Sequence, residues 1–254
     1  IDNFLTKPVN PSQILSACKS ILESRKLKSD YTSKEYISEF RKINSSIDYL
    51  ENMEEWFEVY DKLINWSLRF NRHDESGLRQ IFDDQFTEIN DSFTSYLDRN
   101  YTDWLKTDQR DKLTCGIFPT YIEKEIKQNK KVCLIVVDCL RLDHLKVMLP
   151  LLSEHFTIQH NFSLSLLPTA TPYSRNAIFS GLLPNEIQNK FPREWKKMNT
   201  SETSMNQFEH IFLRDQLNRN NFKNKSMKYI KAVTLKDGQN LEKHFNEYKN
   251  IDLI

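Results

Sequence analysis

The chain has 254 residues, which is enough for one large domain or two modest ones. Hydrophobic residues make up 39% of the sequence, so a packed core can form, and charged residues make up 28%. The formal net charge of +1 does not indicate sequence-independent binding to nucleic acid backbones. Only four glycines are present, and no glycine-rich phosphate loop or Rossmann fingerprint occurs.

We expect a soluble cytoplasmic protein without membrane insertion, because no segment reads as a signal peptide and no apolar run approaches the length of a membrane span. The four cysteines include no Cys-x-x-Cys pair and are expected to be reduced thiols. Both ends of the sequence fall inside expected strands. We therefore expect a fragment of a longer protein.

Residues 1–26 are expected to form a short strand followed by a helix. The strand ends at Lys7 and Pro8, and Asn10 and Pro11 are residues typical of the start of a helix. Apolar residues at helical spacing extend this helix to about residue 25.

Residues 27–115 are expected to be an all-α bundle. Their apolar residues follow the 3.6-residue period in three stripes, which should pack on one another. A polar segment from Arg69 to Gly77 is expected to turn the chain. Aromatic residues among basic ones could stack on bases, but helical spacing favours core positions for Trp56, Trp66 and Trp104. The bundle is expected to act as a spacer or a dimerising element.

Residues 116–254 alternate between expected strands and helices, which predicts an α/β domain. The apolar run 131–137 is expected to be a strand buried on both faces, as in parallel sheets. Helices are expected at 118–128, 142–155 and 171–180, the last stopped by Gly181. Further strands are expected at 156–164, 228–235 and from 251 onward.

Asp138 ends the run 131–137 and is the first candidate site residue. Ligands in open α/β sheets gather at the carboxyl ends of strands, where a carboxylate can hold a divalent cation. Asp138 could instead cap the following helix or pair with Arg141. The six histidines show no spacing typical of metal ligands.

Thr171, directly before Pro172, is the candidate nucleophile. A threonine before proline is common at a helix start, where its hydroxyl caps a backbone N–H, and nothing in that role requires catalysis. The same place suits a hydroxyl that a bound metal activates for attack on phosphorus. Arg175, one turn on, could bind phosphoryl oxygens or pair with a nearby acid. Ser174 is a weaker substrate-binding candidate.

The run Phe4-Leu5-Thr6-Lys7-Pro8-Val9 resembles the last strand of response-regulator receiver domains. The resemblance implies that Lys7 is the switch lysine, which contacts a phosphorylated aspartate. A Lys-Pro turn after any edge strand is the alternative. With this segment the expected organisation is the end of a receiver domain (1–26), a helical linker (27–115) and an α/β domain (116–254).

Two segments resemble the PglZ branch of the alkaline phosphatase superfamily: Leu134 to Arg141, and Leu167 through Thr171 to Pro184. The resemblance implies that Thr171 is the nucleophile, that Asp138 is a metal ligand, and that each active site holds two Zn²⁺ ions. The superfamily completes its site with later Asp and His residues, which we expect beyond Ile254. A fragment that lacks them is expected to be inactive.

The order of the three segments resembles the PorX-like response regulators of type IX secretion systems. The resemblance implies a partial alkaline-phosphatase-like domain that acts as a zinc-dependent phosphodiesterase on nucleotide or oligonucleotide substrates. The partners it implies are a cognate histidine kinase, a second copy in a homodimer, and a sigma factor or secretion-system component. One alternative is a catalytically inactive PglZ domain that serves as a phosphorylation-controlled interaction platform. Another is a phosphomonoesterase or phosphomutase on the same fold.

Overall fold

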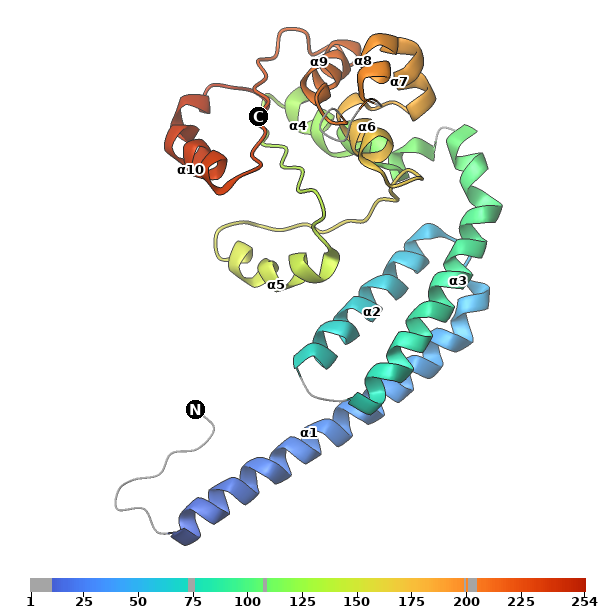
Figure 1. The fold of residues 1–254 in the computed structure, drawn as a ribbon, viewed down its shortest axis with the longest axis vertical. Helices are drawn as coiled ribbons and strands as arrows, with labels where there is room; N and C mark the ends of the chain where they lie inside the picture. The colour runs from blue at the N-terminus through green and yellow to red at the C-terminus, as the bar shows by residue number, and fades with distance from the viewer. Residues whose placement is uncertain (1–10, 73–75, 107–108, 199, 201–204) are drawn as a thin grey trace. The chain divides into compact units, whose positions relative to one another are not determined.

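The computed structural model describes residues 11–72, 76–106, 109–198, 200 and 205–254. Contacts divide the chain into unit 1, Ile1–Asn100 with Cys139–Ile158, and unit 2, Tyr101–Asp138 with Gln159–Ile254. The described residues are mostly helical (Figure 1). None of their helices is both long and apolar enough to cross a bilayer.

The α-helices have these bounds: α1 Pro11–Ser46, α2 Met53–Arg72, α3 Ser76–Lys106, α4 Glu123–Lys127, α5 Leu142–Ser153, α6 Asn176–Ser180, α7 Pro184–Lys190, α8 Pro192–Met198, α9 Glu209–Arg219 and α10 Leu235–His244. Within the described ranges, short 3₁₀ turns and two π turns connect them, the π turns at Phe118–Ile122 and Thr171–Arg175. The strand expected at the start of the chain, with Lys7, lies outside the described residues.

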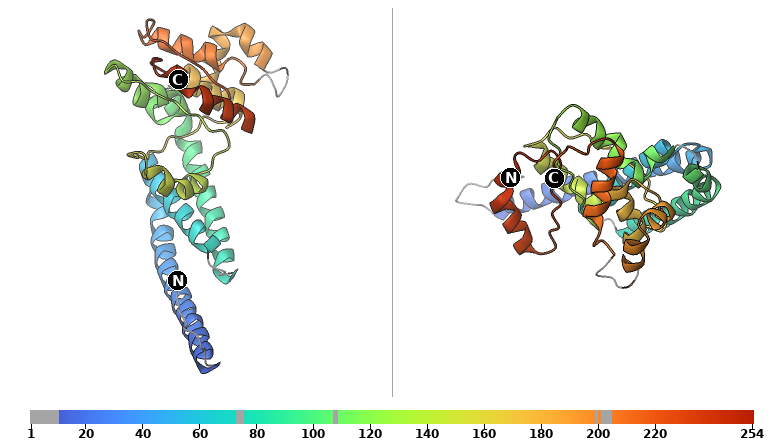
Figure 2. Two further views of the ribbon diagram at one scale, coloured as in Figure 1. Left: turned by 90° about the vertical axis from the view of Figure 1, so that its left-hand side faces the viewer. Right: turned by 90° about the horizontal axis from the view of Figure 1, so that it is seen from above.

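Unit 1 is built on α1, α2 and α3, which run side by side in both views (Figures 1 and 2). Tyr36 of α1 is 1% exposed. Its ring centroid lies 5.1 Å from that of Trp66 and 5.0 Å from that of Phe70, both on α2. Phe70 in turn packs on Phe82 of α3 at 5.6 Å. Such edge-to-face contacts favour burial of these rings, and the prediction that the aromatic residues at helical spacing are core is confirmed for this cluster.

Two further contacts hold unit 1 together. The buried Tyr36 hydroxyl donates to Gln85 Oε1 at 3.0 Å, so the aromatic core keeps its polar atom satisfied. Helix α5 belongs to the same unit, and Lys146 Nζ on α5 lies 2.7 Å from Asp61 Oδ1 on α2.

The first helix is longer than expected. The apolar stripe predicted an end near residue 25, but α1 continues to Ser46. No glycine or proline occurs between Pro11 and Ser46, so nothing in the backbone breaks the helix. Packing of its second half, through Tyr36 and Ile43, supports the continuation.

Unit 2 has a separate core. Phe118, Phe179, Phe212 and Leu217 are among its buried residues, and Ile187 and Met198 of α7 and α8 join them. Helices α6 and α9 approach closely because Gly181 ends α6 with φ +61° and carries no side chain. A Cβ at that position would lie 2.1 Å from Gln216 Nε2 on α9. The predicted stop at Gly181 is confirmed.

The apolar run 131–137 is extended, but the burial expected on both of its faces is wrong. Val132, Leu134 and Val136 pack against the core of unit 2, whereas Ile135 is 76% and Val137 is 55% exposed. An uninterrupted apolar run does not reveal how many of its faces have a neighbour. Among the described residues only one face of this run is covered.

At the other segments expected as strands, only isolated parallel bridges form in them or next to them, and Leu235, expected at the end of one strand, begins α10. Leu253 bridges both Val132 and Met227, and Leu164 bridges Leu113. No β-strand forms within the described residues, so the α/β class is not confirmed and stays a prediction.

Candidate active site

Thr171 opens the π turn Thr171–Arg175, which leads directly into α6. The cap of this turn is Ala170, whose extended backbone (φ −71°, ψ 147°) precedes it. The Ala170 carbonyl accepts the N–H groups of Tyr173 and Ser174, each at 3.0 Å. The alternative role for Thr171, a side-chain cap of the helix, is therefore not seen at this turn. The side chain is half-buried and is not used to start the helix.

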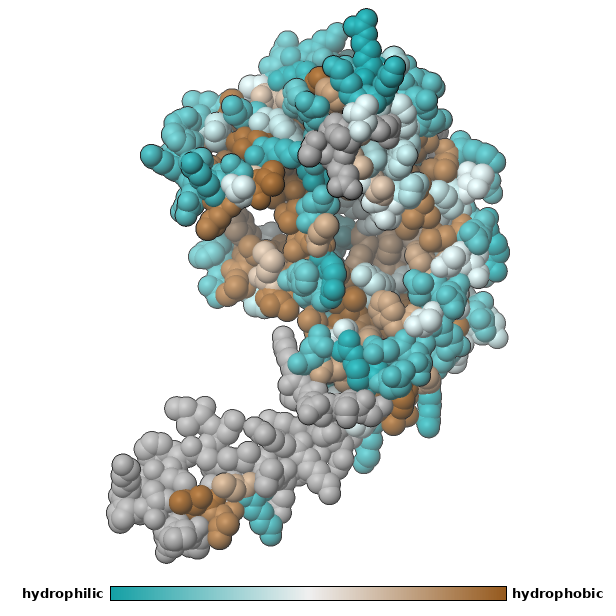
Figure 3. Space-filling model, viewed as in Figure 1, coloured by the Kyte–Doolittle hydropathy of each residue, from teal (hydrophilic) through white to brown (hydrophobic). Residues whose placement is uncertain are grey.

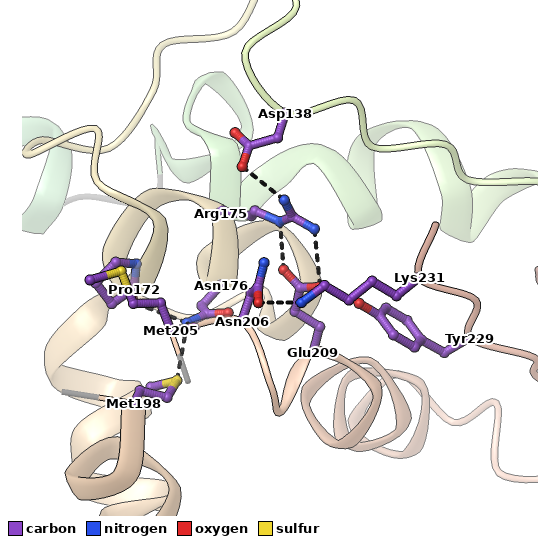
Figure 4. A network of polar contacts seen from close by, with 10 residues as sticks. All are labelled: Asp138, Pro172, Arg175, Asn176, Met198, Met205, Asn206, Glu209, Tyr229 and Lys231. Carbon is purple, nitrogen blue, oxygen red and sulfur yellow. Dashed lines mark hydrogen bonds and ion pairs between the residues drawn. The ribbon is translucent and has the colours of Figure 1, made fainter. Parts of the chain in front are cut away.

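Arg175 ends the same π turn and joins two carboxylates (Figure 4). Its Nη1 donates to Asp138 Oδ2 at 2.9 Å. Its Nε and Nη2 donate to the two oxygens of Glu209 at 2.6 and 3.2 Å. The structure thus brings Asp138 and Arg175 together, while Arg141 forms an ion pair with Asp143.

Glu209 begins α9, and its side chain is fully buried. It also accepts the hydroxyl of Tyr229 (Figure 4). Burial alone would lower the pKa of Arg175, but the hydrogen bonds and charges of Glu209 and Asp138 raise it. Burial raises the pKa of Tyr229, and the contact with Glu209 raises it further. The network therefore holds a charged guanidinium and a protonated phenol.

Sequence reasoning missed Glu209 and Tyr229. One signal was available for Glu209: it lies on the same helical face as Phe212, Leu213 and Leu217, all of which are buried. A carboxylate on an apolar face needs a buried partner, and Arg175 is that partner. Tyr229 carries no comparable signal in the sequence.

Two buried polar side chains, Ser174 and Asn176, stabilise the π turn Thr171–Arg175 through hydrogen bonds. Ser174 is 5% exposed, and its hydroxyl shares a hydrogen bond with that of Ser165. Asn176 is fully buried and its amide donates to Pro172 O at 3.2 Å and to Met205 O at 2.9 Å (Figure 4). These contacts hold in place the segment that carries Thr171.

A cavity of about 890 Å³ lies in unit 2 beside this network. Its walls are Cys133–Asp138 on one side and Lys228–Val233 on the other, with Arg175, Phe179 and Leu213 also lining it. Many of the lining residues are apolar, and Asp138, Arg175, Lys228 and Lys231 bring charge to the cavity.

The residues that the structure describes offer a partial donor set for zinc. They contain no group of three His, Cys, Asp or Glu side chains able to hold a metal. Asp138 and Thr171 carry oxygen donors of a kind that divalent cations accept, but zinc takes four ligands, and Asp138 is paired with Arg175. Lys7, the candidate switch lysine, lies outside the described residues.

Comparison with known families gives two matches. Residues 26–105 match the PorX response regulator linker domain, and residues 117–246 match the BREX system PglZ alkaline phosphatase-like domain. None of the curated proteins matches the chain. The second match spans Asp138, Thr171, Arg175 and Glu209. The chain therefore belongs to the PglZ alkaline phosphatase-like family, as a PorX-like protein in which a response-regulator linker precedes that domain.

Proposed function

We propose that this protein is a two-component response regulator whose PglZ domain hydrolyses phosphodiesters of the nucleotide or oligonucleotide type, within the regulation of type IX secretion. The observation that carries the proposal is the match of residues 117–246 to an alkaline phosphatase-like family. A response-regulator linker directly before this domain supports control by a receiver and a cognate histidine kinase.

In the proposed reaction the Thr171 hydroxyl attacks phosphorus. A bond forms between Thr171 Oγ1 and phosphorus, and the P–O bond to one of the two alcohol groups of the substrate breaks. The hydroxyl proton passes to solvent, and solvent returns a proton to the departing alkoxide. The resulting threonine phosphodiester still carries the second alcohol group of the substrate, and water hydrolyses it to release a phosphomonoester and regenerate the Thr171 hydroxyl. The half-buried position of Thr171 at the start of a turn held by Asn176 supports a fixed nucleophile.

Asp138 and Thr171 are the residues that would hold zinc. When bound, zinc would lower the pKa of the hydroxyl and offset the charge that develops on the phosphoryl oxygens. Arg175 would contact those oxygens through Nη1, the nitrogen that now donates to the exposed carboxylate of Asp138. Glu209 would keep the guanidinium in place meanwhile.

One observation favours a second candidate, a catalytically inactive domain that serves as an interaction platform. The guanidinium of Arg175 already contacts the carboxylates of Asp138 and Glu209. A phosphate could bind it only by displacing one of them. In this role the proposed partners would be a second copy of the chain, a sigma factor or a secretion-system component.

Thr171→Ala in the full-length protein tests the proposal. With zinc present, we expect hydrolysis of bis(p-nitrophenyl) phosphate to fall about a thousandfold or more, because the nucleophile is gone. Thr169→Ala is the matched control, since Thr169 lies two residues away on exposed chain, and it should keep full activity. Activity that survives in the Thr171 variant contradicts the assigned nucleophile.

Assays of the wild-type protein with a phosphodiester and a phosphomonoester distinguish the remaining candidate functions. Preference for p-nitrophenyl phosphate over the diester would favour a phosphomonoesterase. A wild-type protein that hydrolyses neither ester with zinc present would favour the platform. With bis(p-nitrophenyl) phosphate as substrate, mass spectrometry of an acid-quenched reaction should find a p-nitrophenylphosphoryl group on the tryptic peptide that contains Thr171.

A further inference from the structure

The chain segment that leads to Thr171 is held by residues that come just before the PglZ match. Leu164 N–H donates to Lys112 O at 2.8 Å, and Thr114 N–H donates to Leu164 O at 3.0 Å. Thr114 Oγ1 also accepts Leu166 N–H at 3.3 Å. Leu164 and Leu166 are both buried. The segment is therefore fixed in place as far as Leu166.

Tyr101 makes the next contact along this segment. Its hydroxyl oxygen accepts the N–H of Leu167 at 2.8 Å. Tyr101 lies near the end of α3 and within the linker match, whereas Leu167 lies within the PglZ match. Helix α3 begins at Ser76 in unit 1 and continues into unit 2, to which both Tyr101 and Leu167 belong. The hydrogen bond thus joins the end of the linker helix to the segment before Thr171.

The stretch from Leu167 to Ala170 is exposed and has few other contacts. Leu167, Pro168 and Thr169 make no other hydrogen bond to a described residue. In Figure 3 hydrophilic side chains, in teal, lie along α3, so this helix too borders on water. Because water can reach the hydrogen bond between Tyr101 and Leu167, little free energy opposes its breaking.

The chain between Leu167 and Thr171 is short and stiff. Pro168 has a fixed φ angle, and the backbone of Leu167 before it is restricted as well. Ala170 is fixed from the other end, because its carbonyl accepts two N–H groups of the π turn. Few backbone angles are left to absorb a displacement of Leu167, so the displacement reaches Thr171.

We propose that Tyr101 is a positioning residue for Thr171, through which the end of the linker helix aligns the hydroxyl for attack on phosphorus. The effect on the reaction rests on the proposed function, whereas the positioning of Thr171 does not. A movement of α3 that breaks the bond to Leu167 releases the segment and slows turnover. Substrate binding changes little, because the bond sets the alignment of the nucleophile and not a contact with the substrate.

Tyr101→Phe in the full-length protein tests this, because it removes the hydroxyl and keeps the ring. With zinc present, we expect kcat for bis(p-nitrophenyl) phosphate to fall about tenfold, since a misaligned nucleophile slows the chemical step, while KM stays within about twofold. In protein with isotope-labelled threonine methyl groups, the NMR signal of the Thr171 methyl should shift or broaden. The melting temperature should stay within about 2 °C of the parent value, because the lost bond is open to water.

Tyr121→Phe is the matched control. Tyr121 also belongs to unit 2, is 41% exposed, and makes no hydrogen bond through its hydroxyl to a described residue. This variant should leave kcat and the Thr171 signal unchanged.

The inference is overturned if the Thr171 signal of the Tyr101 variant matches that of the parent, or if the control variant changes the signal equally. An active parent whose kcat is unaffected by Tyr101→Phe overturns it as well. A parent that hydrolyses neither ester contradicts the proposed function instead. In that case a Thr171 signal that responds to Tyr101→Phe and not to Tyr121→Phe still supports the positioning role.

Discussion

Arg175 contacts two carboxylates that differ in their exposure to water. Glu209 is fully buried and takes two N–H groups, while Asp138 is 55% exposed and takes one. Water competes for the exposed carboxylate, so the contact with Asp138 is the weaker of the two. We infer that Glu209 positions the guanidinium, and that the contact with Asp138 is the one a phosphate would displace.

Glu209→Gln should therefore destabilise the protein. The change removes the buried charge that balances Arg175 and should lower the free energy of unfolding by about 3 kcal/mol. Urea denaturation followed by circular dichroism measures this. Asp215→Asn is the matched control, since Asp215 pairs with Lys190 and Arg219, whose side chains are 38% and 32% exposed, and should cost about 1 kcal/mol or less. Equal losses would show that Glu209 is no more than a surface partner.

At this scale the sequence predicted individual residues better than their contacts. Strand-end and helix-start patterns identified Asp138 and Arg175, and the structure brings them together. The pattern could not identify Glu209 as the partner of Arg175, because their contact depends on how α6 packs on α9. Helix capping was the alternative role for the Thr171 hydroxyl, but the backbone begins the turn one residue earlier, at Ala170.

At the scale of elements, Gly181 sets the approach of α6 to α9. Gly181→Ala places a Cβ 2.1 Å from Gln216 Nε2 and forces a side chain into φ +61°. The left-handed backbone and the overpacking together should cost about 2–4 kcal/mol of unfolding free energy. Gly238→Ala is the control, because that glycine lies inside α10 with nothing within 4 Å, and alanine there should stabilise by up to about 1 kcal/mol.

Thermal unfolding distinguishes these two variants directly. The Gly181 variant should melt at a lower temperature than the parent protein, and the Gly238 variant at the same or a higher temperature. If Gly181→Ala left the melting temperature unchanged, the close approach of α6 and α9 would not be required for stability.

Helices were predicted more successfully than strands for a physical reason. The hydrogen bonds of a helix join residues four apart, so an apolar stripe is nearly sufficient to predict α2 and α3. A strand needs a neighbour that is distant in sequence. Runs 131–137 and 228–235 have strand composition, but only isolated bridges to Leu253 form, from Val132 in the first run and from Met227 just before the second.

At the scale of the whole molecule, the boundaries of the two family matches differ from the boundaries of the two compact units. The two family matches lie in the predicted order, linker first and PglZ domain second. Yet α5 lies within the PglZ match and packs with α2 in unit 1. No local sequence pattern predicts the contact between Lys146 and Asp61, because the two residues are distant in sequence and meet only in the folded chain.

Each unit has its own aromatic core, which predicts that the two unfold in separate steps. Phe82→Ala removes a 2% exposed ring from unit 1, and Phe212→Ala removes a fully buried ring from unit 2. Each change should cost its own unit about 3–5 kcal/mol and leave the other unit nearly unaffected, because the lost contacts are local.

Hydrogen exchange measured by mass spectrometry at increasing urea concentrations can follow both units in one experiment. Peptides from α2 report the unfolding of unit 1, and peptides from α9 report the unfolding of unit 2. Phe82→Ala should expose the α2 peptides at lower urea while the α9 peptides keep their parent midpoint, and Phe212→Ala should do the reverse. Phe245→Ala, at a 49% exposed position, should move neither midpoint by much. If either core variant shifted both sets of peptides equally, the two cores would be one cooperative structure.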